Sequence, residues 1–275
     1  MRKNQRWYSD NAVAGIITAI LLVGLIVIVI SLIQTTYVPK WMRSIEAEHM
    51  GDVADQFSQL KSAIDIQAAT GQKTPMSTSI TLGNKEIPYF SASRAFGSLL
   101  ILSDNCTVTI TNLSNSSSYS LGIIKYSSKN VYYLDQSYIY EAGSVILNQS
   151  EGNVMSIKPF SAIKNGNVNI TFGIVNITGV GGSTSAGGYG TYPIRTEFVR
   201  NTTVLMNNIK NITIATNYPN AWHQAFKSIL QSANLTYSTD FSVTDIAGEV
   251  TIEFLGATTV NLALNVIEIN AWIAP

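Results

Sequence analysis

The chain has 275 residues, of which 17 are basic and 17 acidic, so its formal net charge at neutral pH is zero. This balance gives no electrostatic basis for binding nucleic acid or an acidic substrate. Only 12% of the residues are charged, against about 25% in an ordinary soluble domain, and asparagine, serine and threonine supply the polarity instead.

The most informative segment is residues 12–33, an apolar stretch without a charged side chain. As a helix it extends roughly 33 Å, enough to cross a hydrocarbon core of about 30 Å. Arg2, Lys3 and Arg6 precede it, which places residues 1–11 in the cytoplasm and the chain beyond the stretch outside. The stretch is too long for a cleaved secretory signal. We therefore predict a transmembrane helix in contact with membrane lipid, or a processed pilin-type segment.

Residues 34–75 are predicted to form a juxtamembrane amphipathic helix and a linker. Pro39 is expected to kink or interrupt the helix, and Gly71 is expected to end it. Apolar residues recur with a helical period on one stripe, which faces either the protein's own domain or a neighbouring copy. The candidates for helix assembly are Gly15, Gly24, Val53, Phe57, Leu60 and Ile64. The two glycines permit close approach of another helix.

Residues 76–275 show the period of two that is typical of strands. Strands are predicted at 77–82, 97–103, 106–112, 119–126, 131–134, 137–140, 144–147, 168–175, 194–199, 211–215, 249–255 and 260–272. One helix is expected at about 220–233, and the glycine-rich tract 179–190 is expected to be a flexible loop. A change of apolar face in the last strand predicts a β-bulge near Val266. The predicted fold class is α+β, a long N-terminal helix followed by a mainly β, sandwich-like extracytoplasmic domain.

Nine N-x-[S/T] sequons lie beyond the apolar stretch, on the side that the charge rule places outside the cell. The candidate glycosylation sites are Asn105, Asn112, Asn115, Asn148, Asn169, Asn176, Asn201, Asn211 and Asn234. Asn105, Asn169 and Asn211 oppose the apolar residues of their predicted strands, so a glycan there would not disturb a core. The alternative is that these residues are simply the polar side chains of a β surface.

The sequence gives little support for an enzyme. His49 lies near Glu46 and Asp52 on the juxtamembrane helix, but a solvated helix face explains this pattern better than a metal site does. His223 lies off the apolar stripe of its helix, and neither histidine is near a nucleophile motif. Cys106, the single cysteine, excludes an intrachain disulfide and is expected to be a buried, inert thiol. Asp135 and Glu141 would act as acid and base only if they faced one another. We predict no catalytic residue, cofactor or metal.

The start of the chain carries a family resemblance. The run from Asp10 to Val23, DNAVAGIITAILLV, is similar to the N-terminal segment of archaeal type IV pilin-like proteins. The stretches 93–99, 138–146 and 222–226 resemble an uncharacterised archaeal family of pilin-like surface proteins. The resemblance implies a structural pilin-like or pseudopilin-like subunit of the archaeal cell surface, which associates with itself or with other pilin-like subunits. Its expected location is the cell membrane, with an extracellular C-terminal domain, or a surface filament.

A second interpretation remains open, because the acidic residue that bacterial pilins carry near the start of this helix is missing here. The chain would then be a non-polymerising, membrane-anchored surface module that binds glycan, the surface layer or a partner protein. Its predicted contact surface consists of Tyr132, Tyr133, Tyr138 and Tyr140. Cross-strand and core packing is the competing explanation for these four side chains.

Overall fold

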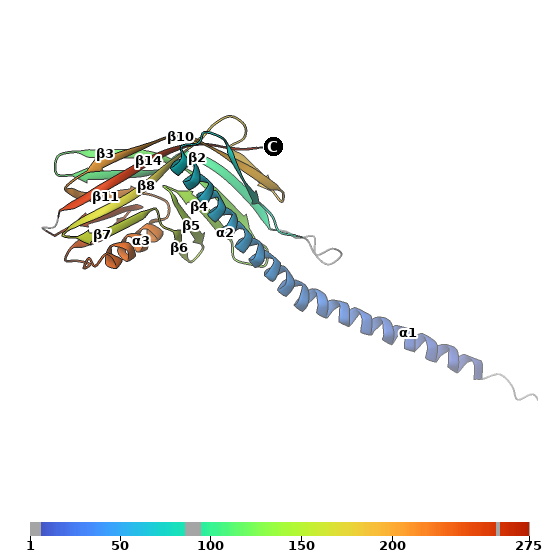
Figure 1. The fold of residues 1–275 in the computed structure, drawn as a ribbon. Coiled ribbons are helices and arrows are strands. Elements are labelled where there is room, and N and C mark those ends of the chain that lie inside the picture. Colours follow the sequence, from blue (N-terminus) through green and yellow to red (C-terminus); the bar gives the residue numbers. More distant parts are fainter. Residues whose placement is uncertain (1–6, 86–94, 257–258, 275) are drawn as a thin grey trace, which may run out of the picture.

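A long helical rod leads into a β-rich domain (Figure 1). The computed structural model describes residues 7–85, 95–256 and 259–274. The rod consists of α1 (Trp7–Leu32), a π-helical segment η1 (Ile33–Tyr37) and α2 (Val38–Thr70). The predicted fold class is confirmed, because a long apolar helix is followed by a domain built mainly of strands.

The hydrogen-bonding pattern of the rod changes at η1. Pro39 has no N–H group and cannot donate the backbone hydrogen bond that an α-helix requires. Just before it, the N–H of Val38 donates to the carbonyl of Ile33, five residues earlier, in the π-helical pattern. The interruption expected at Pro39 is therefore confined to η1, and the rod stays helical. Helix α2 ends at Gly71 as predicted, where a φ of +66° favours glycine.

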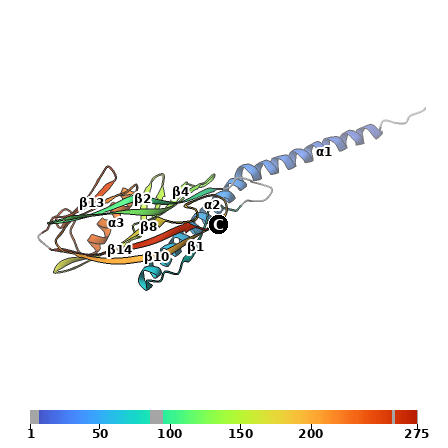
Figure 2. The same cartoon turned by 90° about the horizontal axis from the view of Figure 1, so that it is seen from above.

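Two sheets form the β domain, and Figure 2 shows them as layers. The first sheet has five strands in the order β1 (Met76–Thr81), β10 (Thr191–Met206), β14 (Val260–Ile273), β8 (Asn167–Gly179) and β7 (Phe160–Asn165). Neighbouring strands are antiparallel except β14 and β8, which run parallel. A parallel pair requires a long connection, and the whole segment between these two strands supplies it.

The second sheet has nine strands. Eight of them follow the order β12 (Phe241–Ile246), β13 (Glu249–Phe254), β11 (Ile209–Ala215), β2 (Phe96–Asn112), β3 (Ser116–Lys129), β4 (Gln136–Glu141), β5 (Ser144–Gln149) and β6 (Gly152–Ile157). The ninth, β9 (Ser185–Gly188), pairs with the start of β2. Helix α3 (Pro219–Ser232) packs against β6, β7, β12 and β13.

The buried apolar residues form two clusters. The first contains Trp222 of α3 and Phe172 of β8, and the second contains Phe57 of α2 and Ile177 of β8. Between them β8 comes very close to β3, because a Cβ at Gly122 would lie 1.9 Å from the carbonyl oxygen of Ile177. The two sheets therefore touch at Gly122, and this contact separates the two cores.

Several strands differ from the prediction. β2 is one strand where two were predicted, and its register with β3 shifts between Leu102 and Cys106. Residues 131–134, predicted to be a strand, form a loop instead. The strands β6, β7, β9 and β12 were not predicted, and β9 lies in the tract 179–190 that was expected to be a loop. β9, with the sequence SAGG, has no hydrophobic alternation, whereas β12 alternates Phe241 and Val243 with Ser242 and Thr244 and was missed all the same.

A bulge was predicted in β14 near Val266, but the irregularity lies in β10, the strand that pairs with β14. The buried face of β14 does change, since Leu264 is buried before the change and Ile269 after it. However, β14 stays in register with β8 along its whole length, and the register shift lies in β10 between Phe198 and Arg200. In both β8 and β14 the side chains of one face are buried in the first half of the strand and those of the other face in the second half, because each strand passes from the first core cluster to the second.

Candidate membrane anchor and its junction with the β domain

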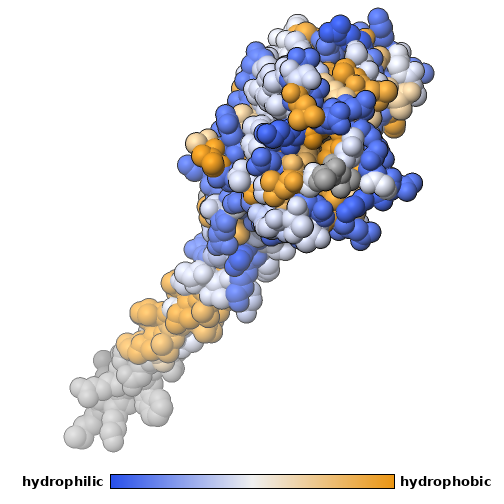
Figure 3. Space-filling view, turned by 90° about the vertical axis from the view of Figure 1, so that its left-hand side faces the viewer, coloured by the Kyte–Doolittle hydropathy of each residue, from blue (hydrophilic) through white to orange (hydrophobic). Residues whose placement is uncertain are grey.

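From Val13 to Leu32, helix α1 exposes its apolar side chains on all sides. The large apolar residues from Val13 to Leu32 are 47–68% exposed. An 18-residue window within the helix Val13–Thr70 has a mean hydropathy of 3.3 and is 0% buried. By length and composition, this is the one helix in the described ranges that is able to cross a membrane. Figure 3 shows the apolar surface continuing along the rod beyond the β domain.

Two glycines lie within the apolar stretch of the anchor, and two aromatic residues lie just past its end. Gly15 and Gly24 have no atom within 4 Å of where a Cβ would stand, so both positions are open to another helix. Just past the apolar stretch, the rings of Tyr37 and Trp41 lie 6.2 Å apart and are 52% and 48% exposed. Amphipathic rings at this level are typical of a membrane–water interface.

The apolar stripe of α2 is buried in the protein's own β domain. Val53, Phe57, Leu60 and Ile64 are all 0% exposed and belong to the second core cluster. The ring of Phe57 lies 5.8 Å from that of Tyr138 on β4. The assignment of these four residues to an assembly surface is therefore corrected, because their own sheets cover them. The chain was predicted to divide at residue 75, between α2 and the β domain. In the structure α2 and the two sheets share the second core cluster and pack as one unit.

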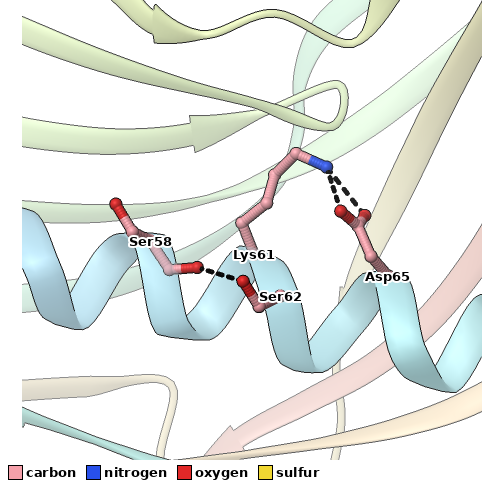
Figure 4. A network of polar contacts seen from close by, with 4 residues as sticks. All are labelled: Ser58, Lys61, Ser62 and Asp65. Carbon is pink, nitrogen blue, oxygen red and sulfur yellow. Dashed lines mark hydrogen bonds and ion pairs between the residues drawn. The ribbon is translucent and has the colours of Figure 1, made fainter.

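The opposite face of α2 is polar (Figure 4). The Nζ atom of Lys61 lies 2.6 and 2.7 Å from the two carboxylate oxygens of Asp65, four residues later. The hydroxyl of Ser62 donates to the carbonyl of Ser58 at 2.9 Å. These local bonds pair polar side chains beside the stripe, among them Lys61, whose side chain is 13% exposed, and Asp65, whose side chain is 50% exposed. The buried stripe provides most of the attachment to the sheets.

A buried carboxylate fastens the start of α2 to the β3–β4 loop. Glu46 is 0% exposed, and its oxygens accept hydrogen bonds from the backbone N–H groups of Val131, Tyr132 and Tyr133 at 3.0, 2.7 and 2.6 Å. Three converging backbone donors supply the hydrogen bonds that the buried carboxyl group requires. Glu46 was grouped with the polar face of the helix, and no sequence signal links it to a loop 85 residues away.

Replacing this carboxylate is expected to weaken the junction. Glu46→Ala leaves three backbone donors without their acceptor and should lower the free energy of unfolding by about 2–4 kcal/mol. Glu48→Ala, on an exposed position of the same helix, should change it by less than about 0.5 kcal/mol. Denaturant unfolding of the full chain in detergent measures both. Equal effects of the two variants would show that the loop contact contributes nothing.

His49 is buried, which corrects the prediction that it lies on a solvated helix face. Its Nε2 atom lies 3.1 Å from the hydroxyl oxygen of Tyr126 and 3.3 Å from the carbonyl oxygen of Leu82. A carbonyl oxygen only accepts, so the contact with Leu82 favours the tautomer that carries its proton on Nε2. Burial lowers the pKa of His49, against smaller opposing effects of the Leu82 carbonyl, Asp52 and Glu46. The imidazole therefore ties α2 to β3 as a neutral group.

A comparison with protein families covers both the anchor and the β domain. The family model described as "Family of unknown function (DUF7289)" matches residues 11–270. The chain belongs to this family. The match runs from the apolar stretch almost to the end of β14, so α1, the junction at Glu46 and both sheets are parts of one DUF7289 unit. Comparison with curated proteins and with solved structures found no match.

A second buried carboxylate in the DUF7289 domain lies at the β4–β5 turn. Glu141 is 0% exposed, and its Oε1 atom accepts hydrogen bonds from the Thr216 hydroxyl at 2.6 Å and from the indole N–H of Trp222 at 2.7 Å. Burial raises the pKa of Glu141, and hydrogen bonds from Thr216, Trp222 and Cys106 oppose that shift. Asp135 is exposed and accepts from the N–H of Asn130, so Asp135 and Glu141 do not form an acid–base pair.

Because Glu141 is buried, its contribution to the free energy of unfolding is expected to fall as the pH rises. Its pKa is higher in the folded chain than in the unfolded chain, so the folded state binds more protons between the two values. The contribution of Glu141 is therefore most favourable below its ordinary pKa and is lost as the pH rises through the folded value. Glu141→Gln keeps an oxygen acceptor and removes the titration. This variant should therefore have a higher free energy of unfolding near neutral pH, and its free energy of unfolding should depend less on pH.

Unfolding measured between about pH 5 and about pH 8 tests this expectation. Glu249→Gln, which makes the same substitution at an exposed carboxylate of the same domain, is the matched control for the loss of one carboxyl group. An identical slope of stability against pH in Glu141→Gln and the unmodified chain would contradict the prediction.

Cys106, also a partner of Glu141, is 2% exposed. Burial raises the pKa of its thiol well above the ordinary value, as expected for an inert group.

The glycosylation candidates differ in accessibility. Asn115, Asn169, Asn201 and Asn234 are exposed, whereas Asn105, Asn112, Asn148, Asn176 and Asn211 are half-buried. Asn176 accepts a hydrogen bond from the N–H of Gly122 at 3.0 Å, and the Oδ1 atom of Asn211 is buried. Four of the nine candidate side chains are therefore accessible, and Asn211 is less accessible than its strand pattern indicated.

The tyrosine surface considered for a binding module does not form. Tyr138 and Tyr140 are 6% and 0% exposed and belong to the second core cluster, while Tyr132 and Tyr133 are half-buried. The hydroxyl of Tyr140 is also buried. Core packing explains this cluster, which corrects its assignment to a contact surface. Within the described ranges, no group of three or more His, Cys, Asp or Glu side chains is arranged to hold a metal ion.

Proposed function

We propose that this chain is a pilin-like or pseudopilin-like structural subunit of an archaeal cell surface, anchored or assembled through α1. The observation that supports the proposal is the contrast between the two halves of the rod. The stripe of α2 is buried in its own β domain, whereas α1 leaves its large apolar side chains from Val13 to Leu32 uncovered. A helix that is apolar all round needs lipid or other helices to cover it.

The same contrast supports a second candidate, a non-polymerising anchored surface module. Because Val53, Phe57, Leu60 and Ile64 are covered by their own domain, the apolar stripe of α2 is not free for contacts between rods. Membrane lipid alone can cover a single apolar helix of this length. In this case the β domain, together with the helix α2 that packs against its sheets, would be displayed as a single copy on α1.

Shearing of surface filaments, followed by electron microscopy and mass spectrometry, distinguishes the two candidates. For a filament subunit, gold-labelled antibody to the β domain decorates filaments along their length, and the chain is recovered from the sheared fraction. The mass of its N-terminal peptide then shows whether the first residues are removed. Recovery from membranes alone, with the N-terminus intact, would overturn the subunit proposal and support the anchored module.

A further inference from the structure

A pocket on the outer face of the five-stranded sheet carries an aromatic side chain and two charges of opposite sign. It has a volume of about 410 Å³ and is lined by Trp272 of β14, Arg195 and Glu197 of β10, and the loop after β8. This volume lies within the roughly 300–1,000 Å³ that is usual for small-molecule sites. The pocket lies outside both core clusters, and neither the anchor nor the junction uses it.

The sheet register brings these side chains together. Arg195 pairs directly with Trp272, and Glu197 follows two residues later on the same face of β10. Trp272 is only half-buried, so part of its indole is open to the pocket. An open indole beside two polar groups offers an apolar surface and a place for hydrogen bonds at once.

Glycines form the wall of the pocket beside the indole. Gly181 and Gly182 have φ values of +45° and +52°, a conformation that other residues rarely adopt. A Cβ at Gly182 would also lie 3.2 Å from Cδ1 of Trp272. The backbone at Gly182 therefore lies against the edge of the ring, and neither Gly181 nor Gly182 adds a side chain to this wall of the pocket.

The two charges do not neutralise each other. Within the described ranges, neither Arg195 nor Glu197 makes a side-chain hydrogen bond or an ion pair. Arg195 offers five N–H donors and Glu197 offers carboxylate acceptors. A ligand that satisfies both needs neighbouring groups that donate and accept, and it needs no net charge of its own.

We propose that this pocket binds a neutral pyranose sugar. The C–H face of the ring would cover the indole of Trp272, and adjacent hydroxyl groups would accept from Arg195 and donate to Glu197. A hydroxyl is both donor and acceptor, which matches this pair better than an anion or a cation does. The β domain would thus carry a saccharide site independent of how α1 is anchored or assembled.

Saturation-transfer NMR with methyl pyranosides tests the proposal on the full chain. The detergent must be zwitterionic, because maltoside or glucoside detergents carry the proposed ligand themselves. At least one of the methyl glucoside, galactoside and mannoside is expected to bind, with the strongest transfer to its C–H face. Trp272→Ala should weaken binding at least about tenfold, and Arg195→Gln, an exposed position, should weaken it without affecting folding.

Matched variants define the outcomes. Lys210→Gln and Glu249→Gln remove exposed charges from the other sheet and should bind sugar like the unmodified chain. Absence of binding of all three sugars to the folded chain would overturn the proposal. Equal binding by the unmodified chain, Trp272→Ala and Arg195→Gln would place the sugar elsewhere and overturn it as well. Binding of phosphate or acetate in place of sugar, lost in Arg195→Gln, would identify an anion site instead.

Discussion

Two aspartates placed in the apolar stretch, at Val23 and Leu25, are expected to release the chain from the membrane. The fourteen large apolar residues between Val13 and Leu32 contribute about 0.3–0.6 kcal/mol each to insertion, or roughly 4–8 kcal/mol together. Each aspartate near the helix centre costs about 2.5–3.5 kcal/mol. The pair therefore offsets most of the favourable free energy of insertion, whereas a single aspartate should reduce anchoring only in part.

Fractionation of cells with an alkaline carbonate wash measures this effect. The unmodified chain should stay in the membrane pellet, and Val23→Asp with Leu25→Asp should move to the supernatant or be degraded. Ile66→Asp is the matched control, because Ile66 is 52% exposed on α2, outside the apolar stretch. Normal membrane retention and surface display of the double variant would contradict the role given to α1.

Gly122→Ala is expected to unfold or strongly destabilise the β domain. The added methyl would lie 1.9 Å from the carbonyl oxygen of Ile177 and 2.9 Å from that of Leu102. Both are backbone atoms of neighbouring strands, so relief requires the two sheets to separate at this contact. Such a shift also disturbs the hydrogen bond from the N–H of Gly122 to Asn176. We expect a loss of more than about 3 kcal/mol, at the upper end for an overpacked position.

Gly51→Ala is the control for this prediction. Gly51 lies within α2, and no atom lies within 4 Å of its added Cβ. Alanine should therefore stabilise the helix by about 0.5–1 kcal/mol relative to glycine. Denaturant unfolding of the two variants should give changes of opposite sign. A loss below about 1 kcal/mol for Gly122→Ala would mean that the sheets separate easily and that the two cores are not held apart there.

The parts of the fold that sequence reasoning predicted correctly are those with strong local patterns. The apolar stretch, the stripe of α2 and the stop at Gly71 each follow from spacing within a few turns. The strands at 137–140 and 144–147 were also predicted, and the two-residue turn between them has φ values of +48° at Ala142 and +80° at Gly143, as a type I′ turn requires. Local chemistry determines these elements, so the sequence is sufficient.

The errors concern contacts between distant segments. An amphipathic stripe shows that a face is buried but not what covers it, so Val53 and Phe57 were equally compatible with a second copy. Glu46 and His49 look like surface residues because their partners, in the β3–β4 loop and on β3, lie far away in the sequence. The pocket at Trp272 was missed for the same reason, since it depends on the register of β10 with β14.

Cysteine labelling in intact cells tests the central claim, an anchored chain with an external β domain, most directly. The single cysteine, Cys106, is 2% exposed, so the unmodified chain should give almost no reaction with a membrane-impermeant maleimide. Ser161→Cys, at an exposed position of β7, should be labelled on intact cells, whereas Ser9→Cys, before the apolar stretch, should be labelled only after lysis. Labelling of Ser161→Cys only after lysis would place the β domain inside the cell and contradict the account.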